Sequence, residues 1–154
     1  MFRRRINLRM RMYNVGMTDV RNFTFSEQVQ RQLEILNVGL VYLFGSQSEG
    51  VSGPMSDVDL GVVFVDPKIS HGNTLQIYSQ LFDLFSELFQ TENLDIVFLE
   101  RATLELRFDV VKYGKILFAA SAEVKDTFEH QTVMLYADFK PVLNNFDKAI
   151  LHRI

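Results

Sequence analysis

The chain has 154 residues, of which 47% are hydrophobic, and this length and composition suit one globular domain with one core. It contains no Cys, which excludes disulfides and thiolate chemistry, and its three histidines are too scattered to indicate a zinc site. No apolar run is long enough for a membrane span and the start lacks the hydrophobic segment of a secretory signal, so we expect a soluble cytoplasmic protein.

Charge is distributed unevenly along the chain. The formal net charge is −3, yet five of the 16 Lys and Arg residues lie near the start, which leaves 11 basic against 19 acidic residues in the remainder. We interpret residues 1–20 as a basic arm and 21–154 as the folded domain. Such an arm can contact nucleic acid or an acidic partner, or it can be a dispensable end that precedes a later methionine start. The residues concerned are Arg3, Arg4, Arg5, Arg9 and Arg11 for the arm and Met10, Met12 or Met17 for the start.

The first half of the domain predicts one helix and two strands. The helix covers about residues 24–37, with Thr24 or Ser26 as its cap, and Gly39 follows as a breaker. Residues 40–44 form a buried strand that ends at Gly45, and the Gly, Ser and Pro residues within 47–56 predict a loop. Residues 57–65 form the second strand, which an Asp-Pro pair ends.

The second half predicts alternating helices and strands. An amphipathic helix covers about 73–91 and a strand covers 94–99. A helix over about 102–113 stops at Gly114, and a strand follows over 115–119. The last helix covers about 122–151, and Pro141 should kink or divide it. This order predicts an α/β or α+β domain with a small mixed sheet of about four strands flanked by helices.

Two carboxylates, Asp57 and Asp59, lie two positions apart on the second predicted strand. Side chains alternate along a strand, so both should point the same way, where they repel one another. A divalent cation removes this penalty, and hard oxygen ligands favour Mg²⁺. An Asp-x-Asp pair is common by chance, so the pair alone is weak evidence.

The dipeptide Gly45-Ser46 strengthens the pattern because it directly follows an apolar strand and is separated from Asp57 by ten residues. Glycine lets the backbone approach a ligand, and the Ser hydroxyl with nearby backbone N–H groups can hold a phosphate. A Gly-Ser turn alone would be ordinary. The probability that a Gly-Ser pair occurs by chance at one fixed distance before Asp-x-Asp is well under about one in a hundred.

A third carboxylate, Asp95, lies within an apolar predicted strand. An unpaired charge there would be costly to bury, so we expect Asp95 to share a metal with Asp57 and Asp59. The alternative is an Asp at a strand end, solvated or capping a turn.

Together these residues resemble the signature of the DNA polymerase β-like nucleotidyltransferase superfamily. The short length and the spacing are similar to its minimal nucleotidyltransferase (MNT) branch, commonly the antitoxin partner of HEPN-domain toxins. The resemblance covers roughly residues 24–150; softer matches are the segment 106–118, similar to a helix–Gly–strand segment of that branch, and Tyr136 to Phe139 in its last helix. The arginine-rich arm lies outside the family pattern.

The resemblance implies a role for each matching residue. Gly45 and Ser46 would hold the β- and γ-phosphates of a nucleoside triphosphate. Asp57, Asp59 and Asp95 would bind Mg²⁺, with two ions expected, and Asp95 would also orient the attacking hydroxyl or accept its proton. ATP would donate AMP to a tyrosine hydroxyl of a HEPN toxin, which would silence the toxin.

Two alternatives stay open at this point. The chain could be an antitoxin that blocks a HEPN ribonuclease by binding alone, or it could transfer a nucleotide to a small molecule. Enzymes of the latter kind generally have a further domain for the acceptor. Apart from the basic arm, we expect no direct binding to nucleic acid, and we expect no membrane binding.

Apolar faces of two predicted helices could be core or interface. For the phenylalanine-rich helix over 73–91 we expect core packing. In the last helix, Phe139, Leu143 and Phe146 could face a partner helix, and core packing is again the expectation. We expect the partner surface near the mouth of the active site.

Overall fold

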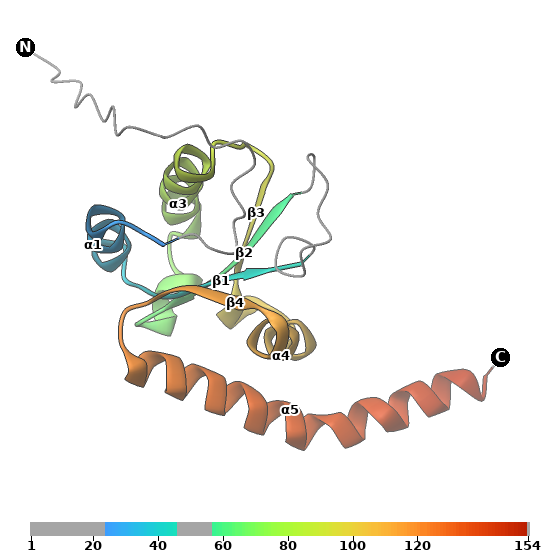
Figure 1. Cartoon of the computed structure of the whole chain (residues 1–154). Helices are drawn as coiled ribbons and strands as arrows, with labels where there is room; N and C mark the ends of the chain where they lie inside the picture. Colours follow the sequence, from blue (N-terminus) through green and yellow to red (C-terminus); the bar gives the residue numbers. More distant parts are fainter. Residues whose placement is uncertain (1–23, 46–56, 154) are drawn as a thin grey trace, which may run out of the picture.

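The computed structural model describes residues 24–45 and 57–153, so the basic arm and Ser46 lie outside the described residues. Its helices and strands follow the predicted order (Figure 1), and each lies within a few residues of its predicted bounds. The strands are β1 (Val38–Phe44), β2 (Val58–Phe64), β3 (Leu94–Phe98) and β4 (Lys115–Ala119). The α-helices are α1 (Glu27–Ile35), α3 (Thr74–Phe89), α4 (Leu104–Tyr113) and α5 (Ala122–Leu151), and two short 3₁₀ helices are η2 (Pro67–His71) and η3 (Leu99–Arg101).

The four strands form one mixed sheet in the order β3-β2-β1-β4, which confirms the predicted fold class. β1 is antiparallel to both β2 and β4, whereas β2 and β3 are parallel. A parallel pair needs a crossover connection, and α3 provides it between β2 and β3. The two central strands are therefore β1 and β2, and β3 is an edge strand.

Helices cover both faces of the sheet: α1 and α3 lie on one face, and α4 and α5 on the other (Figure 1). Alternate residues of β1 serve the two cores, as the strand period of two requires. Val41 and Leu43 pack with residues of α1 and α3, whereas Leu40 and Tyr42 pack with Val110 and Phe128 of α4 and α5. Burial on both faces explains why β1 reads as a continuous apolar run.

Side-chain caps fix three helix starts. Ser26, Thr103 and Ser121 each accept a hydrogen bond from the backbone N–H three residues later. Ser26 was one of the two predicted caps of the first helix, and Gly114 ends α4 as predicted.

The prediction that Gly39 breaks the chain after α1 is wrong. Gly39 lies inside β1, and the turn before it is made by Asn37 in the left-handed region, with φ of 62°. A Cβ on Gly39 would lie 2.8 Å from a methyl group of Val124 in α5. The glycine therefore serves close packing of α5 on the sheet.

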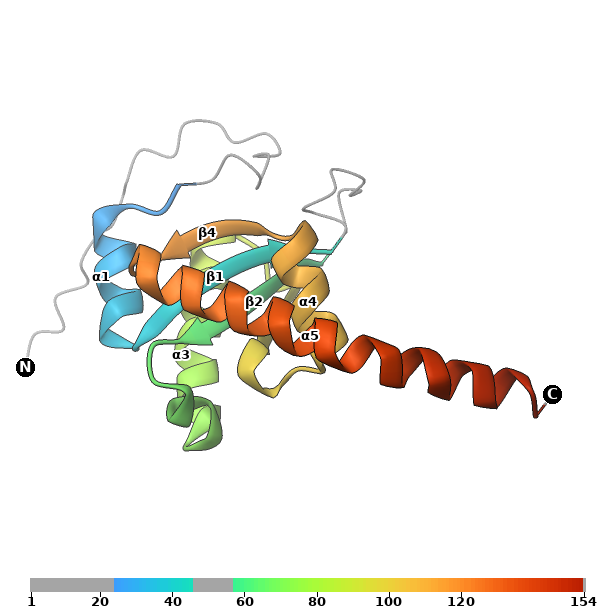
Figure 2. The ribbon, with the colours of Figure 1, turned by 90° about the horizontal axis from the view of Figure 1, so that it is seen from below.

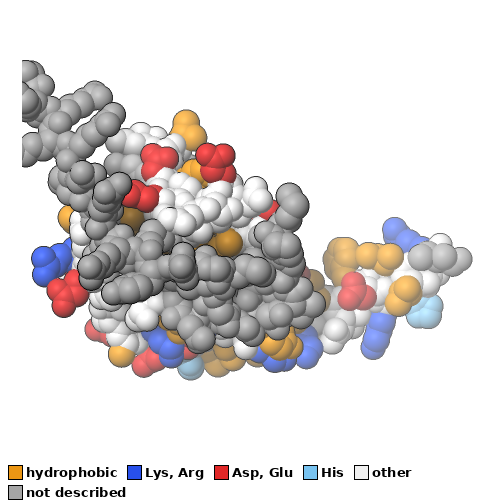
Figure 3. Space-filling view, turned by 45° about the horizontal axis from the view of Figure 1, so that its top comes forward, with side chains coloured by type: hydrophobic (Ala, Val, Ile, Leu, Met, Phe, Trp, Pro, Cys, Tyr) orange, Lys and Arg blue, Asp and Glu red, His pale blue; other side chains and the backbone are white. Residues whose placement is uncertain are grey.

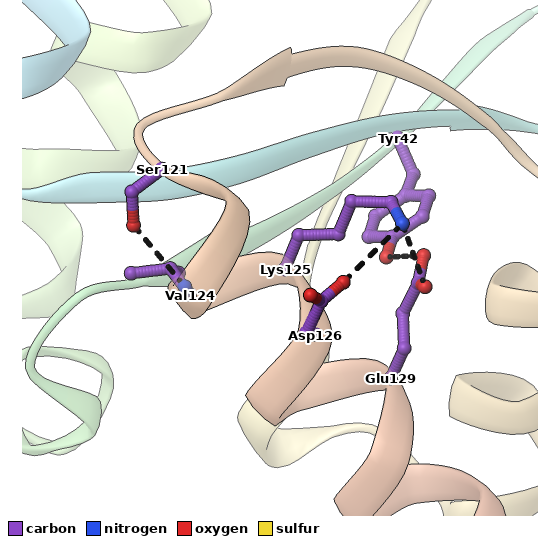
Figure 4. Close-up of polar contacts among 6 residues, drawn as sticks. All are labelled: Tyr42, Ser121, Val124, Lys125, Asp126 and Glu129. Carbon is purple, nitrogen blue, oxygen red and sulfur yellow. Dashed lines mark hydrogen bonds and ion pairs between the residues drawn. The ribbon is translucent and has the colours of Figure 1, made fainter.

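A polar network anchors the start of α5 on the sheet (Figure 4). The Tyr42 hydroxyl donates a hydrogen bond of 3.0 Å to Glu129, whose other carboxylate oxygen lies 3.1 Å from the ammonium group of Lys125. Burial, and then the neighbouring Glu129 carboxylate, raise the pKa of Tyr42 far above its usual value. Tyr42 therefore stays protonated and keeps donating.

α5 continues well past the sheet, and its second half projects from the domain (Figure 2). Pro141 lies inside the helix, which is bent along its length in Figure 1 but not divided. The expectation that its later phenylalanines pack in the core is wrong, because Phe139 and Phe146 are 39% and 68% exposed. In α3, by contrast, Leu81 and Phe85 are fully buried. Across residues 24–45 and 57–153, every helix is too short or too polar to span a membrane.

Candidate active site

The end of β1 and the start of β2 meet at one end of the sheet. Phe44 is the register partner of Asp59, and Gly45 directly follows β1 with φ of 70°. A Cβ on Gly45 would overlap the Asp59 carboxylate oxygen Oδ2 and lie 3.1 Å from its Cγ. Only glycine satisfies both the left-handed backbone and this close approach. The structure thus places Gly45 against Asp59, as their sequence spacing suggested, whereas Ser46 lies outside the described residues.

The burial pattern of β2 shows how its two aspartates point. Val58 and Leu60 are buried in the core beneath α1 and α3, whereas Asp57 is exposed and Asp59 is half-buried. Alternation along the strand therefore directs Asp57 and Asp59 to the same side, opposite to Val58 and Leu60. Their predicted common direction agrees with this pattern.

Asp95 is the register partner of Asp59 in the parallel pair of β2 and β3. Directly opposite residues on neighbouring strands point to the same face, so these carboxylates are neighbours. The expectation that Asp95 is a charge buried in an apolar strand is wrong, because Asp95 is exposed. β3 is an edge strand, and its apolar residues Ile96 and Phe98 face the core while Asp95 faces outward.

Asp59 is affected by the charges of both other aspartates. Its pKa is raised by partial burial first, and then by the negative charges of Asp95 and Asp57. A cation bound here would relieve this repulsion.

The carboxylates suit Mg²⁺ in chemical kind but do not form a ready-made cage. Within the described residues, no group of three or more His, Cys, Asp and Glu side chains is arranged to hold a metal ion. Magnesium in phosphate-transfer sites keeps several waters and takes only one or two carboxylates, with substrate phosphates completing its shell. Asp59 and its register partner Asp95, with Asp57 on the same side, fit that mode of binding.

Basic and aromatic residues of α4 and β4 border the same end of the sheet. Lys115 is the register partner of Leu43, two residues before Gly45. At the end of α4, Tyr113 is 62% exposed and the Lys112 ammonium group lies 4.9 Å from its ring centroid. Sequence reasoning did not assign these residues to the site. These residues belong to the helix–Gly–strand segment that resembles the family, but only the pairing of β4 with β1 shows that they lie at this end of the sheet.

A second polar region lies at the opposite end of β2. A cavity of about 390 Å³ is bounded there by Phe64, Glu100, Arg107 and residues of α5. Glu100 accepts a hydrogen bond from the Phe64 backbone N–H, which ties η3 to β2. Three interacting carboxylates gather at the other end of β2, so that end of the sheet is the better candidate for catalysis.

Solved structures share this fold. A chain from a toxin–antitoxin complex with AMP-PNP is similar at 25% identity and a TM-score of 0.56, over 79% of this chain and 98% of that chain. A chain from a tyrosine-to-alanine mutant of the toxin–antitoxin MntA-HpeT is similar at 25% identity and a TM-score of 0.55, over 77% and 92%. A third, from a double aspartate-to-glutamate mutant of MntA-HpeT, has 24% identity and a TM-score of 0.57, over 77% and 93%.

No curated protein matches the sequence. The sequence of residues 27–123, however, matches the family described as "Polymerase beta, Nucleotidyltransferase". That segment begins with α1 and ends at the start of α5, so it contains the whole sheet and the three aspartates. The chain belongs to the polymerase β nucleotidyltransferase family.

Proposed function

We propose that this protein is a Mg²⁺-dependent nucleotidyltransferase that transfers AMP from ATP to a hydroxyl of a protein partner, a tyrosine of a HEPN-domain toxin, and so acts as a cytoplasmic antitoxin. The observation that carries this proposal is the register that brings Gly45, Asp59 and Asp95 together at one end of the sheet. Family membership supports nucleotidyl transfer, and the similar toxin–antitoxin chain with AMP-PNP supports ATP as donor and a toxin as partner.

Asp57, Asp59 and Asp95 are the residues that would hold Mg²⁺, with two ions as the expected number. When bound, Mg²⁺ supplies positive charge that stabilises the developing charge on the α-phosphate and on the leaving pyrophosphate. Partial burial is the larger cause of the raised pKa of Asp59, and the neighbouring charges of Asp95 and Asp57, which a cation would offset, raise it further and support this assignment.

Each of the chain's own residues has a distinct task in this proposal. Gly45 lets the Asp59 carboxylate lie against the backbone at the end of β1, and Ser46 would bind the β- and γ-phosphates with nearby backbone N–H groups. Asp95 is exposed at the sheet edge, where an incoming hydroxyl can reach it, and it would orient that hydroxyl or accept its proton. Catalysis would come chiefly from positioning and electrostatics.

Positive charge near the site would help to attract the triphosphate. Lys112 at the end of α4 and Lys115 at the start of β4 lie at this end of the sheet, with Lys115 on the face of its register partner Leu43, opposite to the aspartates. We place the partner surface at this same end, because the acceptor hydroxyl has to reach the α-phosphate while ATP is bound.

The double variant Asp57→Ala plus Asp59→Ala tests whether antitoxin action requires catalysis. The proposal predicts that the variant still folds, adds no AMP to a cognate HEPN partner and fails to protect cells from it. Asp83→Asn is a matched control, because Asp83 is an exposed aspartate of α3. A double variant that protects fully without an AMP adduct would show that the protein acts by binding alone.

A further inference from the structure

The C-terminal half of α5 has an apolar face that residues 24–45 and 57–153 leave exposed. The Tyr136 ring stacks on Phe108 of α4, with centroids 3.9 Å apart, and α5 then continues to Leu151 as it projects away from the sheet (Figures 1 and 2). Figure 3 shows hydrophobic side chains on this projecting part, with basic and acidic side chains beside them. A helix of this length is stabilised in water mainly by burial of such a face.

The exposed residues form one stripe. Phe139, Val142, Phe146 and Ile150 follow one another at steps of three or four residues, so they lie along one side of the helix. Val142 and Ile150 are about half exposed. The stripe continues the side on which Phe128 is buried against the sheet. This part of α5 therefore exposes an apolar face of the kind that marks a protein–protein interaction site.

Two opposite charges flank the stripe on the same side. Lys140 and Asp147 are seven residues apart, which on a helix is two turns and about 10 Å. Neither forms an ion pair with another described residue. In an antiparallel pair of identical helices whose two-fold axis passes near Leu143, Lys140 of each copy faces Asp147 of the other.

The same register also fits the apolar side chains together. It places Phe146 of one copy between Phe139 and Val142 of the other, in the manner of knobs into holes. The axis that pairs the charges thus also interleaves the apolar side chains. This self-complementarity is the property that an isologous interface requires, and it favours a second copy over an unrelated partner.

We propose that the C-terminal half of α5 pairs antiparallel with the same segment of a second copy, so that the protein is a dimer. This inference goes beyond the proposed function and does not depend on nucleotidyl transfer. It concerns a surface on the part of α5 that projects beyond the sheet (Figure 2).

Charge exchange tests the register. Sedimentation equilibrium of the full chain should show a dimer, and Lys140→Glu or Asp147→Lys should each raise the dissociation constant about tenfold, because two attractive contacts become repulsive. The double variant should restore the affinity of the original chain. Lys148→Glu is the matched control, since Lys148 lies on the opposite side of the helix from the stripe and should change little. A monomeric original chain, or a double variant no tighter than the singles, would overturn the proposal.

A single introduced cysteine tests the axis without competing thiols, because the chain has no Cys. Leu143→Cys should form a disulfide-linked dimer under mild oxidation, since the axis brings the two residues 143 together. Ile150→Cys should remain unlinked, because its counterpart in the antiparallel pair lies far along the helix. Linking at both positions would indicate a parallel pair, and linking at neither would indicate no pair; either result contradicts the proposal. AMP transfer by these variants should be unchanged, which separates this test from that of catalysis.

Discussion

Asp59 and Asp95 are register partners on two parallel strands, although 35 residues, including the α3 crossover, lie between them in the chain. Asp59 is half-buried and lies against Gly45, whereas Asp95 is exposed at the sheet edge. In the proposed mechanism, Asp59 would therefore lie beside the bound phosphates and Asp95 where an acceptor can reach it. This division of positions is the structural basis of the roles proposed for them.

Replacing Asp59 by Asn should stabilise the fold while abolishing activity. The substitution removes a partly buried charge that Asp57 and Asp95 repel, so we expect a gain in Tm in metal-free buffer at neutral pH. Thermal unfolding measures the gain, and AMP transfer measures the loss. A less stable Asp59→Asn protein would show that the three carboxylates do not repel one another as described.

Magnesium should stabilise the original chain but not the Asp59→Asn variant. A ligand that binds only the folded state raises the unfolding temperature with concentration, by about 2.7 kcal/mol of free energy at one hundred times its dissociation constant. Thermal unfolding over a Mg²⁺ titration, with and without a non-hydrolysable ATP analogue, checks this. Equal shifts in the two proteins would remove Asp59 from the metal site.

The pH dependence follows from the raised pKa of Asp59. A proton on this carboxyl blocks its binding to a cation, so activity should fall as the pH drops through a range above the ordinary Asp value of about 3.9. The folded state binds this proton more tightly than the unfolded state does, so in metal-free buffer the contribution of Asp59 to stability should decrease as the pH rises through the same range.

The cause of that shift can be tested directly by carboxyl NMR titration. Burial is the larger cause and should persist, but Asp95→Asn removes one neighbouring charge and should lower the pKa of Asp59. Asp83→Asn, on α3, should leave it unchanged. An identical Asp59 pKa in the Asp95→Asn protein would contradict the proximity inferred from the strand register.

Gly45→Ala should lower activity more than Gly72→Ala does. The added methyl group would collide with the Asp59 carboxylate, and φ of 70° disfavours an L-residue, so we expect a loss of about 1–3 kcal/mol in stability and displacement of Asp59. Gly72→Ala is the comparison, because a Cβ there meets its nearest atom at 3.6 Å and φ is negative. Wild-type rates of AMP transfer in Gly45→Ala would contradict the role of this glycine.

The Tyr42–Glu129 hydrogen bond predicts an asymmetry between two substitutions. Tyr42→Phe removes the donor and should cost about 0.5–1.5 kcal/mol, whereas Glu129→Leu leaves the buried hydroxyl unsatisfied and should cost about 1–3 kcal/mol. Denaturant unfolding with matched slopes measures both. If Tyr42→Phe proves the more damaging change, the hydroxyl has a more important partner than Glu129.

Much of the fold could be predicted from the sequence because its elements have strong local signals. The apolar runs of β1 and β2, the amphipathic period of α3 and the cap at Ser26 each depend on residues close in sequence. Gly39 was misread because a glycine before a strand and a glycine inside it look alike. Only the packing of Val124 from α5 distinguishes them.

The residues of the candidate site could be proposed from the sequence, but their exposure and their neighbours could not. The spacing of Gly45, Asp57 and Asp59 is local and specific. The exposure of Asp95 depends on β3 being an edge strand, and the approach of Lys115 depends on the pairing of β4 with β1. Likewise, the exposure of Phe146 depends on how far α5 extends past the sheet, which its apolar pattern does not reveal.

The intact mass of a cognate HEPN partner after incubation with this protein, ATP and Mg²⁺ distinguishes AMP transfer from inhibition by binding alone. If the protein transfers AMP, the partner gains the mass of one or more AMP groups on a tyrosine. We predict no gain with Asp59→Asn or Asp95→Asn, and an unchanged gain with Asp83→Asn. An unmodified partner that the protein nevertheless binds and neutralises, or an equal mass gain with the Asp59→Asn variant, would contradict the proposed function.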